Sequence, residues 1–432
     1  MGSFVHNIVV DGTGNITTPF RVLVIGGSYG GLSAALNLQD LCQSRAPRCG
    51  PGPVEGQQLD KPREIAVEIT IVDERDGFYH LIGSPLALAS ESYAEKAWVK
   101  FEDIPALRSP NIRTVHGSVQ YVDTESKIAT VVANGGDPTT SQIQYDYLVA
   151  SAGLRRVWPV VPQSLRRKQY LFEASEHIRA SANARHGVAV VGGGAVGIEM
   201  AAELKLVQPQ LTVTLVHSRS QLLSSEPLPA EAKDASLVLV REAGVDVLLS
   251  HRLDRTEEET SDNGSDKCLR LHFTNGHTML ADQVIMAISR PIPSSSFLPA
   301  QALDKDGYVR IRPDLAFPAD VANGDDHFAI GDMVSWSGIK RCGGAMHMGY
   351  FAANNVYRRM VQRIGRGGEG DVKELKEIPP MIGLAVGKKA MSYWPQTGVA
   401  MGEDVMEAFF GNDLGFTICW NHLQLGESRV VA

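Results

Sequence analysis

Closely spaced cysteine pairs, an excess of basic charge and long apolar runs are all missing from this 432-residue sequence. No two of its five cysteines have the short spacing of a redox motif, although Cys42 and Cys49 flank a Pro- and Gly-rich stretch and could pair. No His/Cys cluster has the spacing of zinc or iron–sulfur ligands. The cysteine positions are 42, 49, 268, 342 and 419. We therefore expect free thiols, a reducing compartment and no metal site.

The charge balance is acidic, with 41 Lys and Arg against 49 Asp and Glu, for a net charge of −8. A chain of this charge without a basic run is a poor nucleic-acid binder. No apolar stretch reaches the roughly 18 residues of a membrane-spanning helix, and the first 20 residues lack a secretory signal. These absences predict a cytoplasmic protein, free or in peripheral contact with a membrane. We expect a monomer or homodimer whose partner is a small-molecule electron acceptor.

Glycine, by contrast, is abundant, and it clusters in two similar blocks. Residues 21–38 read RVLVIGGSYGGLSAALNL and residues 187–204 read GVAVVGGGAVGIEMAAEL, with seven of eighteen positions identical. Each block has a β-branched run, then glycines, then an Ala-rich helical pattern. The repeat predicts two strand–turn–helix units, each the start of a dinucleotide-binding fold.

The glycine spacing has a physical meaning in such a turn. The first glycine allows a tight bend, the second lets the backbone approach a pyrophosphate, and the third lets the helix pack close to the strand. The pyrophosphate then binds N–H groups at the start of the helix. A plain tight turn is the alternative for either motif alone, but two copies favour nucleotide sites. The candidate residues are Gly26, Gly27, Ser28, Gly30 and Gly31 in the first block, and Gly192, Gly194 and Gly197 in the second.

The residue at the end of the next strand should bind the ribose of the nucleotide. Asp73 follows the apolar run 68–72 and is the candidate for ribose hydroxyls at the first site, with a solvated strand-end Asp as the alternative. It lies further past Gly26 than the usual interval of about 20 residues, and an insertion at 45–61 accounts for the excess. The second block has no such carboxylate. Ser218 and Arg219 are the candidates there for a 2′-phosphate, unless Arg219 is simply an exposed loop residue.

These features together resemble the FAD-dependent pyridine nucleotide-disulfide oxidoreductases. A late Gly331-Asp332 follows a short apolar strand, and in that family this Asp binds the flavin ribityl chain. Ser151-Ala152-Gly153 resembles the Ala-Thr-Gly that ends the first segment, and the family's last helix, here near Ala345, directs its N-terminus at the flavin. The resemblance implies Gly153, Gly331, Asp332 and Ala345 as FAD contacts.

The fold expected from this resemblance is α/β and similar to glutathione reductase. It has two Rossmann-like dinucleotide-binding domains, with the NAD(P)H-binding domain at 158–283 inserted into the FAD-binding domain at 20–157 and 284–366. A small α+β C-terminal domain is expected at 371–432.

Within the superfamily, the sequence is most similar to the apoptosis-inducing-factor-like branch, which includes the ferroptosis suppressor proteins. The similar segments are GGGAVGIEMAAELK at 192–205, TVTLVHS at 212–218 and GVDVLLSHRL at 244–253. The branch implies FAD and NAD(P)H as cofactors, hydride transfer to the flavin, and reduction of a quinone-like acceptor.

Four residues are predicted to act near the flavin. Glu199 would position the nicotinamide, although compensation of the helix dipole would also favour Glu there. Lys340 would stabilise negative charge on the reduced ring, unless it is a solvated loop Lys. His347 would protonate an acceptor oxygen, and His80 would line the isoalloxazine cleft. Cys342 is expected only to pack.

Two departures from the family bear on function. Residues 77–92 contain no Cys, so we expect no dithiol–disulfide exchange through a protein cysteine pair. The Lys and Phe that the branch carries near the flavin correspond to Phe410 and Gly415. Three functions stay open: an NAD(P)H oxidoreductase with a quinone-like or other small organic acceptor, a tailoring flavoenzyme that oxidises or reduces one metabolite, and a non-enzymatic signalling flavoprotein.

Overall fold

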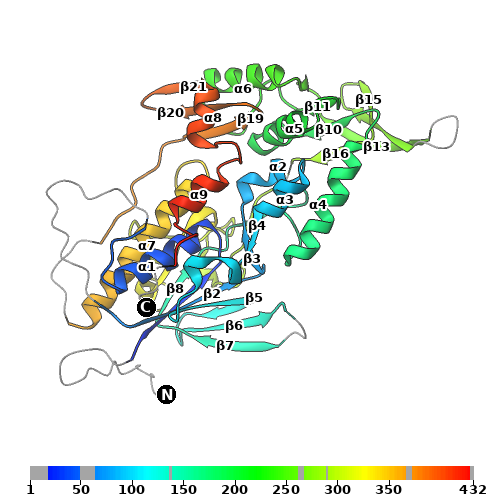
Figure 1. Ribbon diagram of the computed structural model, residues 1–432. Coiled ribbons are helices and arrows are strands. Elements are labelled where there is room, and N and C mark those ends of the chain that lie inside the picture. Colours follow the sequence, from blue (N-terminus) through cyan, green and yellow to red (C-terminus); the bar gives the residue numbers. More distant parts are fainter. Residues whose placement is uncertain are drawn as a thin grey trace.

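The computed structural model describes residues 18–48, 64–135, 139–260, 267–288, 290–365 and 372–428. Most of the insertion predicted at 45–61, with Cys49, therefore lies outside the described residues. A mixed sheet and a parallel sheet form the centres of two dinucleotide-binding folds, and a C-terminal segment follows them (Figure 1). This arrangement confirms the predicted α/β class with two Rossmann-like domains.

The first sheet has the strand order β18-β8-β1-β2-β5-β6-β7. Its first five strands are parallel, and β6 and β7 extend it in antiparallel fashion. Helices α1 and α7 lie side by side next to these strands (Figure 1). The elements are β1 Phe20–Ile25, α1 Tyr29–Cys42, β2 Val67–Asp73, β5 Ile112–Asp123, β6 Ile128–Ala133, β7 Thr140–Gln144, β8 Tyr147–Ala150, β18 His327–Ala329 and α7 Cys342–Arg363.

The second sheet has the order β12-β11-β10-β16, and all its pairs are parallel. Strands β10 and β11 are buried along their whole length, as their continuous apolar sequence requires when both faces of a sheet are covered. Strand β16 pairs with β10, so this sheet extends beyond the boundary at 283 that the sequence suggested. Its elements are α4 Arg167–Ala182, β10 Val188–Val191, α5 Ala195–Val207, β11 Val213–Val216, α6 Ala230–Glu242, β12 Asp246–Leu248 and β16 Gln283–Met286.

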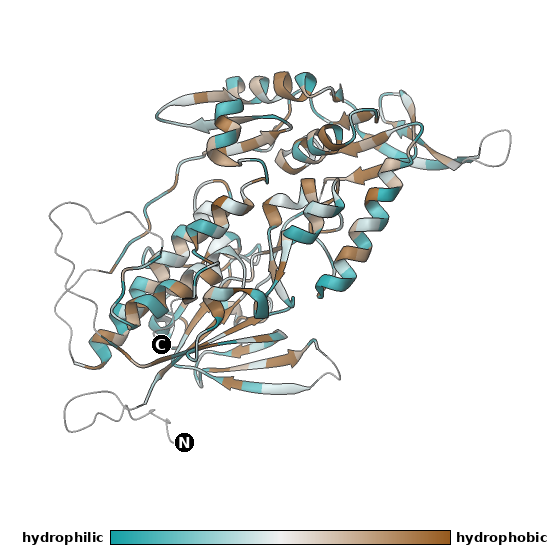
Figure 2. Ribbon diagram, in the orientation of Figure 1, coloured by the Kyte–Doolittle hydropathy of each residue, from teal (hydrophilic) through white to brown (hydrophobic). Residues whose placement is uncertain are grey.

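Smaller elements complete both domains. Residues 253–260 and 267–273 form an antiparallel strand pair, which residues 278–281 extend by one further strand. Helix α4 mixes hydrophilic and hydrophobic residues along its length, as a surface helix does (Figure 2). These elements are β3 Gly77–Tyr79, α2 Ser84–Ala87, α3 Glu91–Ala97, β4 Trp98–Lys100, β9 Leu154–Arg155, β13 Leu253–Thr260, β14 Lys267–Phe273, β15 Thr278–Ala281 and β17 Ile292–Pro293.

The C-terminal segment contributes residues to the hydrophobic cores of both domains. Leu384 and Met391 belong to the core built around α5 and the second sheet, whereas Phe416 and Leu423 belong to the core of the first domain. The segment therefore bridges both domains and is less separate than its composition suggested. It contains β19 Ile382–Val386, β20 Lys389–Trp394, β21 Gly398–Gly402, α8 Glu403–Phe409 and α9 Phe416–His422.

Candidate functional site

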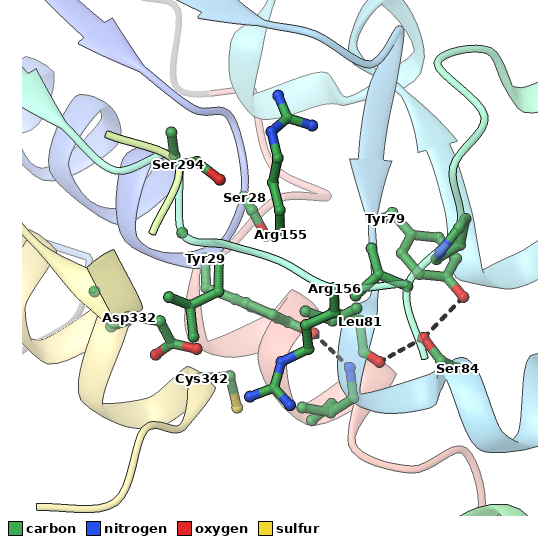
Figure 3. A pocket seen from close by; sticks show the side chains of 18 of the residues that line it. Ser28, Tyr29, Tyr79, Leu81, Ser84, Arg155, Arg156, Ser294, Asp332 and Cys342 are labelled. Carbon is green, nitrogen blue, oxygen red and sulfur yellow. Dashed lines mark hydrogen bonds between the residues drawn. The ribbon is translucent and has the colours of Figure 1, made fainter. Parts of the chain in front are cut away.

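One cavity is lined by residues of both domains (Figure 3). The first domain supplies the start of α1, the end of β2 and the start of α7, and the second supplies Val196 and Glu199 of α5. Nine other predicted residues share its wall: Gly27, Ser28, Gly30, Asp73, Gly153, Gly331, Asp332, Lys340 and Ala345. Residues predicted from both nucleotide-binding motifs thus meet at one site.

The first glycine turn has the geometry that a pyrophosphate needs. Gly26 has φ +103°, a conformation that residues with a side chain rarely adopt. A Cβ on Gly31 would lie 1.8 Å from the carbonyl oxygen of Gly26, so only glycine lets α1 start this close to β1. Ser28 is the extended N-cap of α1, and its side chain makes no capping hydrogen bond. The first backbone N–H groups of α1 therefore point at the cavity without a side-chain cap.

Asp73 closes the turn from the end of β2. Its carboxylate accepts hydrogen bonds from the backbone N–H of Gly27, at 2.6 Å, and of Arg75, at 2.7 Å. Burial raises its pKa, while the Arg75 charge and the two N–H donors oppose that shift. The carboxylate is thus fixed beside the cavity, where ribose hydroxyls would need an acceptor.

The late Gly-Asp motif also lines the cavity. Gly331 has φ +75° and places Asp332 on the cavity. Burial raises the pKa of Asp332, and the positive charges of Lys340 and Arg156 oppose that rise. Lys340 donates to the carbonyl oxygen of Val334 and lies 5.4 Å from the ring centroid of Tyr308, and burial lowers its pKa. Lys340 is therefore held at the cavity wall by these contacts. The alternative prediction, a solvated loop lysine, is wrong.

His80 was predicted to line the cleft, but it lies one side chain behind the cavity wall. It is fully buried, with Nε2 3.0 Å from the carbonyl oxygen of Leu414 and Nδ1 3.1 Å from the hydroxyl of Tyr29. Burial lowers its pKa to about 4, so the ring is neutral, with Nε2 as donor and Nδ1 as acceptor. Tyr29 itself faces the cavity (Figure 3).

The second glycine turn has the same geometry as the first. Gly192 has φ +128°, and a Cβ on Gly197 would lie 1.8 Å from the Gly192 carbonyl oxygen. Gly194 is the N-cap of α5, and a Cβ added there would meet no atom within 4 Å, which leaves open space for a ligand. The backbone N–H of Gly193 donates to Nδ1 of His217 at 3.1 Å.

Ser218 and Arg219 follow His217 on the same loop. Arg219 is exposed, and its Nη1 donates to the hydroxyl of Ser224 at 3.2 Å. Nε2 of His217 lies 2.9 Å from the same hydroxyl. Ser224 therefore links the imidazole and the guanidinium into one polar group at the strand end.

Glu199 lies on α5 where that helix faces the cavity. Its Oε1 accepts a 3.4 Å hydrogen bond from the backbone N–H of Ala385 in β19. Burial raises the pKa of Glu199 to about 8. The side chain is thus a mostly protonated carboxyl near neutral pH, able to donate as well as accept.

His347, predicted to act near the flavin, does not line this cavity. Its side chain is exposed on α7, and its ring centroid lies 4.5 Å from that of Phe351. The geometry therefore gives no support to His347 as a proton donor in the cavity. The register of α7 turns the neighbouring Ala345 to the cavity instead.

Sequence reasoning missed several wall residues. Tyr29 follows Ser28 inside the first motif, and Arg155 and Arg156 come two and three residues after Gly153, so their neighbours gave a usable signal. Cys342 also lines the cavity (Figure 3), although the sequence suggested only packing. His217 lies where the first domain has Asp73, directly after the strand that pairs with the first strand of its repeat.

The residues present fit FAD. The uncapped start of α1 and its two essential glycines match a pyrophosphate. The carboxylates of Asp73 and Asp332 on the same cavity match a ribose and a ribityl chain. The second turn, with open space at Gly194, fits the pyrophosphate of NAD(P)H in the same way.

Comparisons with known proteins agree with this fit. A family model described as pyridine nucleotide-disulphide oxidoreductase matches residues 20–349. The chain is 49% identical to "Oxidoreductase OXR1" of Ajellomyces capsulatus over 415 residues, covering 95% of this chain and 89% of that protein. It is 26% identical to mouse ferroptosis suppressor protein 1, covering 80% and 83% of the two chains.

A solved structure shares the fold over nearly the whole chain. The sulfide:quinone oxidoreductase of Aquifex aeolicus superposes with a TM-score of 0.62 at 17% identity, covering 91% of this chain and 92% of that one. With the fold, both nucleotide motifs and the matched residues in agreement, this chain belongs to the pyridine nucleotide-disulphide oxidoreductase family, in its apoptosis-inducing-factor-like branch, and is an oxidoreductase that uses FAD and NAD(P)H.

Proposed function

We propose that this protein takes a hydride from NAD(P)H and passes the electrons, through FAD, to a quinone-like or other small organic acceptor. The observation that carries the proposal is the position of Glu199. It belongs to the helix that starts at the second glycine turn, yet it lines the cavity that Ser28 and Asp332 of the first domain also line. A nicotinamide held along α5 would therefore reach the same cavity as a flavin held by α1.

Different residues of the chain would bind the flavin nucleotide, orient the nicotinamide and stabilise charge. Asp73 and Asp332 would hold the flavin nucleotide at two points, while Glu199 would donate a hydrogen bond that orients the nicotinamide. Lys340 would stabilise negative charge near the reduced ring. Bound flavin supplies the redox chemistry, since it takes up a hydride and returns electrons singly or in pairs.

The experiment that tests this proposal is anaerobic reduction of the purified flavoprotein with NADH or NADPH. We expect the flavin absorbance band to bleach and to return when a quinone is added. A band unaffected by either nucleotide would contradict the proposal. Oxygen and small carbonyl compounds serve as competing oxidants in the same assay.

A tailoring flavoenzyme is the second candidate. Phe410 and Gly415 replace the Lys and Phe of the branch, and neither lines the cavity: Phe410 is buried in a C-terminal cluster with Val405 and Leu414. This difference supports an acceptor unlike that of the ferroptosis suppressor proteins. Reoxidation by one specific metabolite, with quinones inert, would favour this candidate.

A further inference from the structure

Two arginines at the cavity wall form no ion pair with a carboxylate of the described chain. Arg341 is the N-cap of α7, and Arg156 directly follows β9. Both line the cavity, and Figure 3 shows the side chain of Arg156 extending into it. A third arginine of the wall, Arg155, is paired with Glu74 at 2.6 Å. Because arginines that are withdrawn from water are normally paired in this way, the other two indicate a missing anion.

Arg341 is half-buried against the C-terminal segment. Its Nη2 lies 2.8 Å from the sulfur of Met381, and its Cζ lies 5.8 Å from the ring centroid of Trp394. Burial lowers the pKa of Arg341, and the nearby Cys342 opposes that shift. A thioether and an indole carry no net charge, so these contacts leave the positive charge of the guanidinium without a counter-charge.

Arg156 lies on a different segment, and its charge acts on both domains. It opposes the rise that burial causes in the pKa of Asp332 in the first domain and of Glu226 in the second. Lys340 acts on Asp332 in the same way. Asp332 therefore faces two cations of the wall, while no described carboxylate pairs with Arg341. A ligand with a negative charge would correct this imbalance.

The phosphates of the two nucleotides have binding groups elsewhere in the site. The glycine turns at the starts of α1 and α5 offer backbone N–H groups to them. Arg341 instead contacts Met381 and Trp394, which precede β19 and end β20. It therefore lies where the C-terminal segment meets the cavity, away from both glycine turns.

We propose that Arg341 and Arg156 bind an acidic group of the electron acceptor, which is therefore a small organic anion with an apolar body. The inference rests on the proposed function, because it identifies the chemical class of that acceptor. A guanidinium can hold a carboxylate through two parallel N–H···O hydrogen bonds. Apolar side chains of the same wall would contact the rest of the molecule; they are Leu81, Ile82, Pro85, Val160, Val161 and Val196.

Binding can be measured with a probe that undergoes no redox chemistry. The oxidised, flavin-loaded protein is titrated in a calorimeter with naphthylacetate and with naphthylacetamide, which has nearly the same shape without the charge. We expect the acid to bind about tenfold or more tightly, because the amide cannot make charge-assisted hydrogen bonds as an anion does.

The variants assign this preference to the two arginines. Arg341→Met and Arg156→Met should each remove most of it, whereas Arg341→Lys should keep part of it. Arg113→Met, which removes an exposed arginine of β5, is the matched control and should bind like the parent protein. No preference for the acid in the parent protein, or a preference that either Met variant keeps in full, would overturn the proposal.

Electron transfer gives a second test that avoids the nucleotide step. The flavin is reduced with dithionite and reoxidised by a naphthoquinone with an acetic acid side chain, or by the methyl ester of the same quinone. We expect the acid to react about tenfold or more faster at low concentration, and Arg341→Met to remove the difference. Equal rates in a protein that NAD(P)H still reduces would refute this inference and leave the proposed function standing. A preference for the acid in a protein that neither nucleotide reduces would refute the proposed function alone.

The same variants distinguish an acceptor site from a phosphate site. Flavin content and the affinities for NADH and NADPH should be unchanged in Arg341→Met. A loss of flavin or of nucleotide affinity, with the preference for the acid intact, would assign Arg341 to a cofactor phosphate and overturn the proposal.

Discussion

His217 occupies in the second domain the position that Asp73 occupies in the first. Gly27 donates its backbone N–H to the Asp73 carboxylate, and Gly193, its counterpart in the repeat, donates to Nδ1 of His217. Because that donor occupies Nδ1, the neutral ring carries its proton on Nε2. Burial lowers the pKa of His217, and the nearby charge of Arg219 lowers it further. An anionic acceptor for ribose hydroxyls is thus replaced by a neutral donor next to a cation.

Replacing Arg219 with Ala should weaken the use of NADPH selectively. A charge-assisted hydrogen bond to a 2′-phosphate is worth about 1.5–3 kcal/mol, which corresponds to a loss of roughly tenfold or more. NADH has no such phosphate and should be little affected. The measurement is the rate of flavin reduction as a function of each nucleotide's concentration. Equal losses for both nucleotides would remove Arg219 from this role.

Replacing His217 with Asp should shift the preference toward NADH. The carboxylate can still accept the N–H of Gly193, as Asp73 does with Gly27, so the turn should keep its shape. Its charge would accept ribose hydroxyls and repel a 2′-phosphate. We expect the ratio of apparent affinities, NADH over NADPH, to rise by about tenfold or more. His217→Asn, which adds no charge, is the matched control and should change the ratio much less.

The sequence was a good guide to features built from neighbouring residues. A glycine turn is local, so both strand–turn–helix units and the roles of Gly26, Gly31, Gly192 and Gly197 could be predicted. The hydrogen bond from Gly193 to His217 could not be predicted, because it depends on the side-chain placement at the end of β11.

Features that depend on tertiary packing were missed or misplaced. His80 is close to Asp73 in sequence, but its position behind Tyr29 depends on contact with Leu414 from the far end of the chain. The C-terminal segment was predicted as a separate domain because nothing local reveals that Leu384 and Phe416 pack in two different cores.

Replacing Gly31 with Val should prevent flavin binding. A Cβ there would lie 1.8 Å from the Gly26 carbonyl oxygen and 2.7 Å from the Ser151 hydroxyl, so α1 must move away from the turn. Overpacking of this kind costs about 1–3 kcal/mol of folding stability. Flavin content per folded chain is the measurement. Gly135→Val is the control, because a Cβ at that position would lie 3.7 Å from Nδ1 of His116, an ordinary van der Waals distance. A folded Gly31→Val protein with full flavin would show that the site is misassigned.

Replacing Glu203 with Gln should stabilise the protein more at alkaline than at acidic pH. Glu203 is 1% exposed, and burial raises its pKa to about 8 from an ordinary 4.5. Between these two values the unfolded chain has released the proton and the folded chain keeps it, so the free energy of unfolding falls as pH rises. Gln has no proton to lose. Thermal unfolding of both proteins at about pH 5 and about pH 8 should therefore show a gap that grows with pH, and a constant gap would contradict the raised pKa.

Glu199 gives the sharpest test of how the nicotinamide is oriented. Hydride transfer needs the reacting atoms about 3–3.5 Å apart, and an error of about 1 Å can cost on the order of a hundredfold in rate. Glu199→Ala should therefore slow flavin reduction strongly, with flavin content unchanged. Since the pKa of Glu199 is about 8, its acid form predominates near neutral pH, and Glu199→Gln should reduce at nearly the parental rate. The parental rate should fall as pH rises through about 8, while the rate of the Gln variant should not change with pH.

The control is Glu231→Ala, which removes an exposed carboxylate from the first turn of α6. If Glu199 only compensated the helix dipole, Glu199→Ala would lose about 0.3–1 kcal/mol of stability and keep a normal reduction rate in stopped-flow measurements.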